Sequence, residues 1–203
     1  MNLFKDVEGK ALPEQLRWFN EPVQWAFRGG ELFVQAEPST NLFNDPDKSS
    51  RENTAHYLYT TANGDFSFTA RVEVDMLSMF DAACLLVKVD EDRWAKLCYE
   101  NWLNEPSIVS VVTRQLSDDC PSLRIGRVKP YLRILRSGDC FGFFFSLDAQ
   151  DWTVIRYFTM DVPREVKVGV VAQSPVGTGC PVHVEFFEFE LKEIKTAKYV
   201  EKD

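Results

Sequence analysis

The residues best suited to bind a small polar molecule lie between positions 94 and 102. Trp94, Lys96 and Glu100 are separated by even numbers of residues, and Trp102 follows shortly after them. Side chains alternate between the faces of a β-strand, so Trp94, Lys96 and Glu100 would share one face, with about 13 Å between Lys96 and Glu100. Ammonium and carboxylate groups hydrogen-bond to hydroxyls, and indole rings stack on sugars. The spacing predicts a binding face for a carbohydrate or polyol.

Two more residues complete the candidate binding set. Arg51 belongs to a polar segment that precedes these strands, and His56 lies on the strand face opposite Tyr57 and Tyr59. The predicted ligand-binding residues are Arg51, His56, Trp94, Lys96, Glu100 and Trp102. The alternative interpretation is a solvated sheet face on which lysine and glutamate discourage aggregation, with a structural histidine.

Catalysis has weaker support in the sequence. Glu188 and Glu190, like Glu73 and Asp75, are two residues apart, which is about 6.6 Å along a strand. Glycoside hydrolysis uses two carboxyl groups about 5–10 Å apart, so this spacing fits. However, the alternating charges around Glu188 indicate an exposed face, and the chain has no Gly-x-Ser-x-Gly motif and no phosphate-binding loop. We assign no catalytic residues and expect a non-enzyme; a glycoside hydrolase is the enzymatic alternative.

Acidic turns are the other candidate sites for chemistry. Asp90-Glu91-Asp92 and the pair Asp148 and Asp151 could bind calcium. Aspartate is also common in hairpin turns, where its side chain bonds to nearby backbone. We therefore expect no metal and no other cofactor.

The elements that must position these residues are short β-strands. Strands are predicted near residues 54–60, 65–75, 82–90, 93–101, 107–114, 131–137, 140–147, 152–158, 166–173 and 182–191, after a first hairpin at 25–36. Residues 13–19 could form a helical turn, 38–51 a long loop, 117–130 a surface loop, and 192–203 a helical or frayed tail. Many evenly spaced strands predict an all-β sandwich or barrel that forms one domain, residues 1–203.

The hairpin that carries Lys96 and Glu100 has a two-faced pattern. Ala83, Leu85 and Val87 would face the core, and Cys84 and Cys98 would lie on the opposite face. If residues 90–92 form a three-residue turn, Cys84 lies directly opposite Cys98 and a disulfide is conceivable; a two-residue turn would break this register. Reduced thiols are the expected state.

Composition limits the possible partners. The 203 residues carry a formal net charge of -8, which disfavours nucleic acid and anionic membranes as partners. The first residues lack the pattern of a signal peptide, and five cysteines without metal spacing suit a reducing compartment. We expect a cytoplasmic monomer or dimer, since open sheet edges can pair.

Several segments together are specific to a known family. They are Gly64 to Phe66, Phe80 to Asp90, Trp94 to Glu100, Val111 to Asp118, Ser146 to Trp152 and Val168 to Pro175. Through them the chain resembles, from about Trp18 to Leu191, a concanavalin A-like family of unknown function that includes regulation-of-enolase-type proteins. Asp119 and Cys120 stand where relatives tend to have a tryptophan, and Ala149 stands where they tend to have a turn glycine.

The resemblance implies a jelly-roll sandwich of two curved antiparallel sheets, whose concave face is the usual ligand surface. It also implies an alternative function, a cytoplasmic regulatory protein that binds a metabolic enzyme such as enolase through the 38–51 and 115–130 loops. Fold alone does not assign an activity. The expected partner is therefore either a small carbohydrate or polyol, or a metabolic enzyme.

Overall fold

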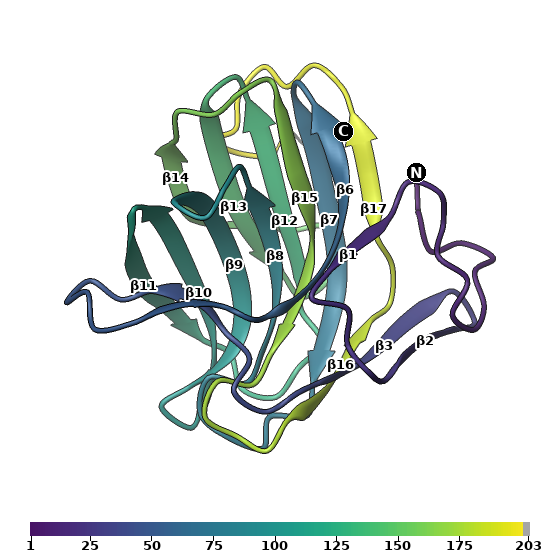
Figure 1. The fold of residues 1–203 in the computed structure, drawn as a ribbon. Coiled ribbons are helices and arrows are strands. Elements are labelled where there is room, and N and C mark those ends of the chain that lie inside the picture. The colour runs from purple at the N-terminus through teal and green to yellow at the C-terminus, as the bar shows by residue number, and fades with distance from the viewer. Residues whose placement is uncertain (201–203) are drawn as a thin grey trace.

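Two antiparallel β-sheets packed face to face make up most of the computed structural model, which describes residues 1–200 (Figure 1). The seven-stranded sheet has the order β1 (Arg17–Phe19), β6 (His56–Asn63), β15 (Glu165–Gln173), β8 (Ala82–Lys88), β9 (Arg93–Trp102), β10 (Glu105–Arg114), β11 (Leu116–Arg124). The eight-stranded sheet has the order β14 (Thr153–Thr159), β13 (Cys140–Ser146), β12 (Tyr131–Ser137), β7 (Phe66–Val74), β16 (Cys180–Val184), β3 (Glu31–Ala36), β2 (Trp25–Arg28), and β17 (Glu188–Leu191) also pairs with β7. The predicted sandwich of two antiparallel sheets is confirmed.

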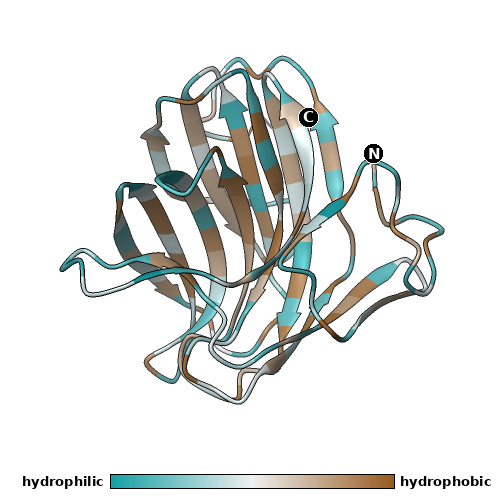
Figure 2. Cartoon of the chain, in the orientation of Figure 1, coloured by the Kyte–Doolittle hydropathy of each residue, from teal (hydrophilic) through white to brown (hydrophobic). Residues whose placement is uncertain are grey.

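The main core lies between the two sheets. It includes alternate residues of β7, such as Phe66 and Phe68, and alternate residues of β8 and β9, such as Leu85 and Leu97. Figure 2 shows the resulting bands of apolar colour along the central strands. Burying these alternating side chains fixes the register of each strand, because a slip of one residue would turn every side chain to the other face.

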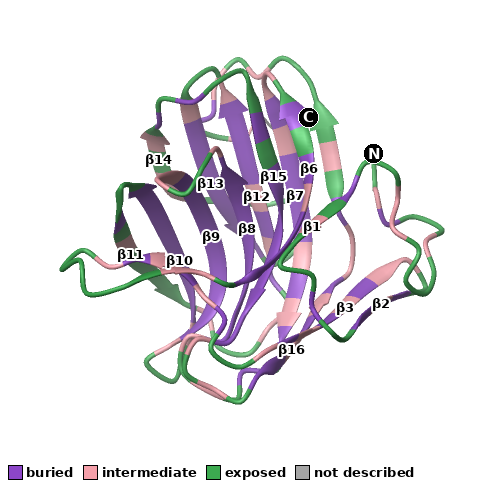
Figure 3. Ribbon diagram, viewed as in Figure 1, coloured by how far each residue is buried: buried purple, intermediate pink, exposed green. Residues whose placement is uncertain are grey.

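A second, smaller core lies on the outer face of the seven-stranded sheet. Residues 38–53, here called the strap, cross this face and contain a small sheet of β4 (Leu42–Asn44) and β5 (Arg51–Asn53). The strap covers Cys84, Leu86 and Trp94 on the sheet beneath it. Strand β8 is therefore buried along its whole length, as Figure 3 shows, which explains why residues 82–87 are all apolar.

Three predicted features outside the core were wrong. Residues 117–130 were expected to be a loop, yet 116–124 form β11, an edge strand whose mostly exposed positions and Pro121 hide the strand pattern. Residues 182–191 are two strands, β16 and β17, rather than one. Residues 192–200 are not helical and do not fray away from the fold, because Ala197 is buried against Leu135 and Phe144. The end of that predicted tail, 201–203, lies outside the described residues.

Helices are absent from residues 1–200, and accordingly no helix there could span a membrane. The helical turn expected at residues 13–19 is a short turn in which Leu16 donates a 2.9 Å backbone hydrogen bond to Pro13, followed by β1. Ala149, at the position of the missing turn glycine, has a φ of 62°, in the left-handed region that glycine adopts without strain.

The β8–β9 hairpin has the three-residue turn that places Cys84 opposite Cys98. Val89 donates a 2.9 Å backbone hydrogen bond to Arg93, leaving residues 90–92 as the turn, and Cys84 pairs with Cys98. Both cysteines are buried free thiols. Burial raises the pKa of the Cys98 thiol well above its ordinary value, so this thiol stays protonated at neutral pH.

Candidate ligand-binding site

A pocket of about 250 Å³ lies on the outer face of the seven-stranded sheet, beneath the strap. One wall comes from the strap, and the rest of the lining comes from the sheet and its loops. The lining residues are Lys96, Glu100 and Trp102 of β9, Val111 of β10, Asp119 of β11, Gln173 and Pro175 at the end of β15, Phe80, and Asn41, Phe43 and Asp45 of the strap.

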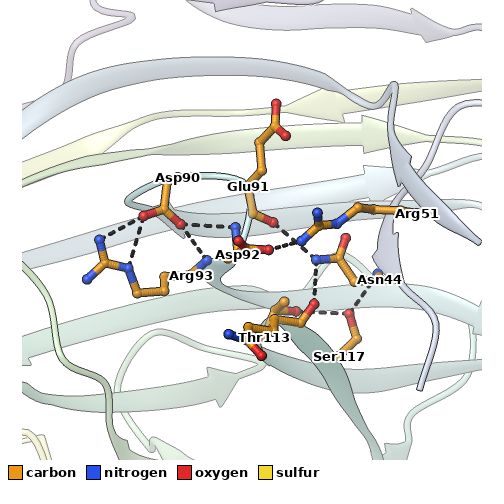
Figure 4. Close-up of polar contacts among 9 residues, drawn as sticks. Asn44, Arg51, Asp90, Glu91, Asp92, Arg93, Thr113 and Ser117 are labelled. Carbon is orange, nitrogen blue, oxygen red and sulfur yellow. Dashed lines mark hydrogen bonds and ion pairs between the residues drawn. The ribbon is translucent and has the colours of Figure 1, made fainter. Parts of the chain in front are cut away.

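Asn44 fastens the strap to the sheet beside this pocket (Figure 4). Its side-chain amide donates to the backbone oxygens of Glu91 at 3.1 Å and Gln115 at 2.8 Å. Its own backbone N–H donates to Ser117 Oγ at 2.9 Å. The strap is thereby tied to both turns that flank strands β9 and β10.

Both ends of the strap are also held. Near its start, Ser174 donates a 3.0 Å backbone hydrogen bond to Thr40 Oγ1. At its end, Lys88 Nζ donates to Asn53 Oδ1 at 2.8 Å. These anchors fix the wall formed by Phe43 and Asp45 over the sheet.

Lys96 supplies a buried positive charge to the pocket. The side chain is only 2% exposed, and its ammonium group donates a 3.0 Å hydrogen bond to Gln173 Oε1. Its Nζ also lies 5.9 Å from the ring centre of Trp94. An ammonium group has three donors, so Lys96 retains capacity to bond a ligand.

Two carboxyl groups in the pocket lack full hydrogen bonding. Glu100 is 5% exposed, and no group within residues 1–200 hydrogen-bonds to its carboxyl or forms an ion pair with it. Burial raises its pKa to about 7, opposed by the charge of Lys96. Asp119 has a buried Oδ1 without a partner among the described residues, and burial raises its pKa too. Such groups are costly to bury unless a ligand bonds to them.

Aromatic rings form the apolar part of the wall. Phe80 and Trp102 pack edge to face, with ring centroids 5.7 Å apart and planes at 70°. Phe43 of the strap lines the same space. A pocket with flat rings beside convergent polar groups is typical of small-molecule sites.

Three of the six predicted binding residues line this pocket: Lys96, Glu100 and Trp102. Trp94 shares their face but is fully buried in the second core, next to Lys96 rather than in the pocket wall. Arg51 is paired with Asp92 at the β8–β9 turn and lines a separate hollow. The structure therefore brings together half of the predicted set.

His56 lies on the other side of the sheet, so its placement on the ligand face was wrong. Its neighbour Tyr57 belongs to the outer-face core, and its cross-strand partner Ala172 belongs to the main core. Both ring nitrogens are engaged, Nδ1 with Asn20 O at 2.7 Å and Nε2 with the backbone N–H of Glu37 at 3.2 Å. These contacts support a structural role.

The other carboxylate candidates also lie away from the pocket. Glu190 pairs with Lys192 at 2.6 Å, and Glu73 pairs with Lys129 at 2.6 Å. In the acidic turns, Asp90 binds Arg93, and no group of three potential metal ligands occurs within residues 1–200.

Sequence reasoning missed several lining residues. Asp119 lies on the edge strand that was predicted to be a loop, and β11 shows no apolar alternation that could have revealed it. Gln173 comes from a strand 77 residues after Lys96. Phe43 and Asp45 lie in the 38–51 segment, which was expected to be functional only because long loops often are. The sequence therefore offered little signal for these four positions.

Comparisons with known proteins agree with this architecture. The sequence profile of a family described as "Protein of unknown function (DUF1349)" matches residues 18–193. "Regulation of enolase protein 1" of Saccharomyces cerevisiae is 22% identical over 175 residues, covering 86% of this chain and 87% of the yeast protein. A crystal structure of a functionally unknown protein from Saccharomyces cerevisiae matches with a TM-score of 0.83 at 21% identity, covering 88% of this chain and 97% of the other.

Two further solved structures share the fold. The GH43 protein BlXynB from Bacillus licheniformis matches with a TM-score of 0.74 at 13% identity, over 93% of this chain but only 38% of that protein. Lectin I-B4 from Griffonia simplicifolia matches with a TM-score of 0.58 at 12% identity, over 94% of this chain and 98% of the lectin. These similarities confirm the concanavalin A-like sandwich. Because the family profile spans nearly the whole chain, the protein belongs to the DUF1349 family of proteins of unknown function.

Proposed function

We propose that this protein binds a small carbohydrate or polyol in the pocket beneath the strap. The observation that carries the proposal is the convergence of the buried side chains of Lys96 and Glu100, and of Asp119 with its buried carboxyl oxygen, on one pocket with aromatic walls. Desolvated polar groups without partners reduce stability, so a ligand with hydroxyls would gain by satisfying them.

The size of the pocket suits a small ligand. Sites for drug-sized molecules are about 300–1,000 Å³. At about 250 Å³, this pocket is slightly smaller than that range. It therefore fits a ligand of monosaccharide size better than an extended oligosaccharide.

The strand register places the two acidic residues of the sheet that line the pocket on different strands. Glu100 lies opposite Ser107 of β10, and Asp119 lies opposite Val111. Their Cα atoms are thus about 13 Å apart along the strands and about 9.6 Å apart across them. Besides burial, the charge of Asp119 nevertheless contributes to the raised pKa of Glu100, so the two carboxyl groups interact within the pocket.

A thermal-shift screen tests the binding proposal. Neutral monosaccharides, short oligosaccharides and polyols are each titrated into the protein, with and without calcium. A bound ligand raises the melting temperature by an amount that grows with its concentration. The variant carrying Lys96→Met and Glu100→Gln should stay folded and lose this response, while Lys5→Met, an exposed lysine, should keep it. If no compound stabilises the wild type, the proposal is wrong.

The name of the yeast relative supports a second candidate, a cytoplasmic regulatory protein that binds a metabolic enzyme such as enolase. The surface expected for this role lies beside the pocket. It consists of the 38–51 and 115–130 segments, which follow the strap and β11. Size-exclusion chromatography with purified enolase tests it. Co-elution that is lost when exposed strap residues such as Lys48 are changed would support this candidate; separate elution would count against it.

A further inference from the structure

Building on the proposed function, we propose that the pocket accepts a single neutral sugar unit and rejects sugar phosphates and sugar acids. The sugar unit is either a free monosaccharide or the end of a chain. Three features of the pocket support this selectivity: its charges, its unfilled hydrogen-bonding positions and its closure by the strap.

The charges lining the pocket disfavour anions. The lining residues carry one ammonium group, that of Lys96, and three carboxyl groups, those of Asp45, Glu100 and Asp119. The lining residues, all within residues 1–200, include no arginine, the side chain that best matches phosphate and carboxylate groups. Lys96 already donates one hydrogen bond to Gln173. A ligand phosphate would therefore meet more negative than positive charge.

The unfilled positions are mostly hydrogen-bond acceptors. Asp119 Oδ1 is buried without a partner within the described chain, and the Glu100 carboxyl has no hydrogen bond there. Asp119 Oδ1, and the Glu100 carboxyl when it is ionised, need donors from the ligand, which hydroxyl groups supply and phosphate oxygens do not; when Glu100 is protonated, its O–H can donate to a ligand hydroxyl oxygen. Burial raises the pKa of Glu100 to about 7 and also raises the pKa of Asp119, so part of the carboxyl charge is neutralised in the folded protein; this weakens the attraction for a second cation beside Lys96 and leaves a neutral ligand as the best fit.

The strap limits the ligand to one unit. Phe43 and Asp45 form a wall over the sheet, and Asn44 holds that wall through its hydrogen bonds to Glu91 and Gln115. Aromatic residues of the opposite wall supply ring faces on which one sugar can stack. A continuous polysaccharide would need an open groove, whereas this pocket accommodates a free sugar or a chain end.

Isothermal titration calorimetry at neutral pH tests the selectivity with matched probes. Glucose, galactose, mannose and xylose are compared with glucose 6-phosphate, galactose 6-phosphate, mannose 6-phosphate, glucuronic acid and glucosamine. We expect at least one neutral sugar to bind, with its phosphate and acid forms at least about tenfold weaker, because each adds negative charge beside carboxylates. Glu100→Gln and Asp119→Asn each lower the negative charge of the pocket. Both variants should therefore reduce the difference in affinity between the neutral sugar and its phosphate or acid form.

The outcomes separate this inference from the proposed function. If a neutral sugar binds but its phosphate binds equally well or better, the selectivity is wrong and the binding function stands. Tighter binding of glucosamine than of glucose would show a cation site, which also overturns the selectivity. If none of the neutral probes binds in the titrations or in the wider thermal-shift screen, both proposals fail. The selectivity is judged on the wild-type protein, from the affinity of the neutral sugar relative to that of its phosphate and acid forms, so the test holds even if a variant does not fold.

Discussion

The ammonium group of Lys96 on β9 donates a 3.0 Å hydrogen bond to Oε1 of Gln173 on β15, across the intervening strand β8. This bond fixes a buried charge at the base of the pocket and connects three strands of one sheet. It also orients Gln173, whose amide nitrogen lies 3.4 Å from the carbonyl oxygen of Phe80. The polar base of the pocket and one of its aromatic walls are thus parts of the same network.

Replacing Lys96 with methionine should abolish ligand binding and leave the fold intact. Methionine fills a similar volume, and the Glu100 and Asp119 carboxyls that lose the nearby positive charge can take up a proton instead of remaining buried and charged. Urea unfolding should change by less than about 1.5 kcal/mol, while the ligand-dependent rise in melting temperature should disappear. Unaltered ligand binding in Lys96→Met would remove Lys96 from the site.

Glu100 should make stability depend on pH. Its pKa is raised from 4.5 to about 7 in the folded protein, so the folded state holds a proton that the unfolded state releases. Stability from this group is present below about pH 4.5 and is lost as pH rises through about 7. Relative to Glu100→Gln, the wild type should lose on the order of 3 kcal/mol across this interval. Urea unfolding of both proteins at about pH 5 and about pH 8 measures this; parallel pH profiles for the two proteins would show that Glu100 titrates normally.

Asn44→Ala should loosen the strap more than the sandwich. The substitution leaves the carbonyl groups of Glu91 and Gln115 without their amide donor, which costs about 1–3 kcal/mol. Hydrogen exchange should accelerate across residues 38–53 and remain slow in β8. Lys48→Ala, at an exposed strap position, is the matched control and should leave exchange unchanged. Uniform acceleration over both sheets would instead mean that the strap and sandwich unfold together.

The two histidines should differ in their effect on stability. His56→Ala removes ring contacts to Asn20 and Glu37, so it should destabilise the protein by about 1–3 kcal/mol without changing ligand affinity. His183, which is less buried and packs on Phe33, serves as the control and should cost less. Chemical denaturation and calorimetry provide the two readouts. Loss of ligand affinity in a well-folded His56→Ala protein would return His56 to the binding site.

Ala149→Gly should stabilise the protein. Ala149 has a φ of 62°, where a side chain costs roughly 1–2 kcal/mol that glycine avoids. Part of this gain is offset because glycine makes the unfolded chain more flexible. We expect a net increase of about 0.5–1 kcal/mol in the free energy of unfolding, measured by urea denaturation. A decrease would show that the turn around Asp148 already compensates for the strain.

The strands that carry alternating apolar residues were predictable from the sequence. In β7, Phe66 and Phe68 alternate with polar neighbours. For the β8–β9 hairpin, the sequence allowed two turn lengths, and the structure has the three-residue turn that pairs Cys84 with Cys98. Strand β11 was not predictable because it is an exposed edge with little apolar pattern. In β6, Tyr57 and Leu58 are buried on opposite faces, so apolar character could not tell which face His56 occupies.

The site was only partly predictable for a related reason. Lys96 and Glu100 lie on one strand, so their spacing alone places them on one face. Gln173 and Asp119 reach the same pocket from β15 and β11, and which strands neighbour β9 depends on long-range pairing that local patterns do not encode.

The strap and its smaller core also have a consequence for how the pocket can vary. Because β8 and β9 separate this core from the one between the sheets, substitutions at Asn41, Phe43 and Asp45 reshape the pocket without disturbing the packing that holds the sandwich together. Changes at these three positions can therefore alter the shape and charge of the pocket while the scaffold stays the same.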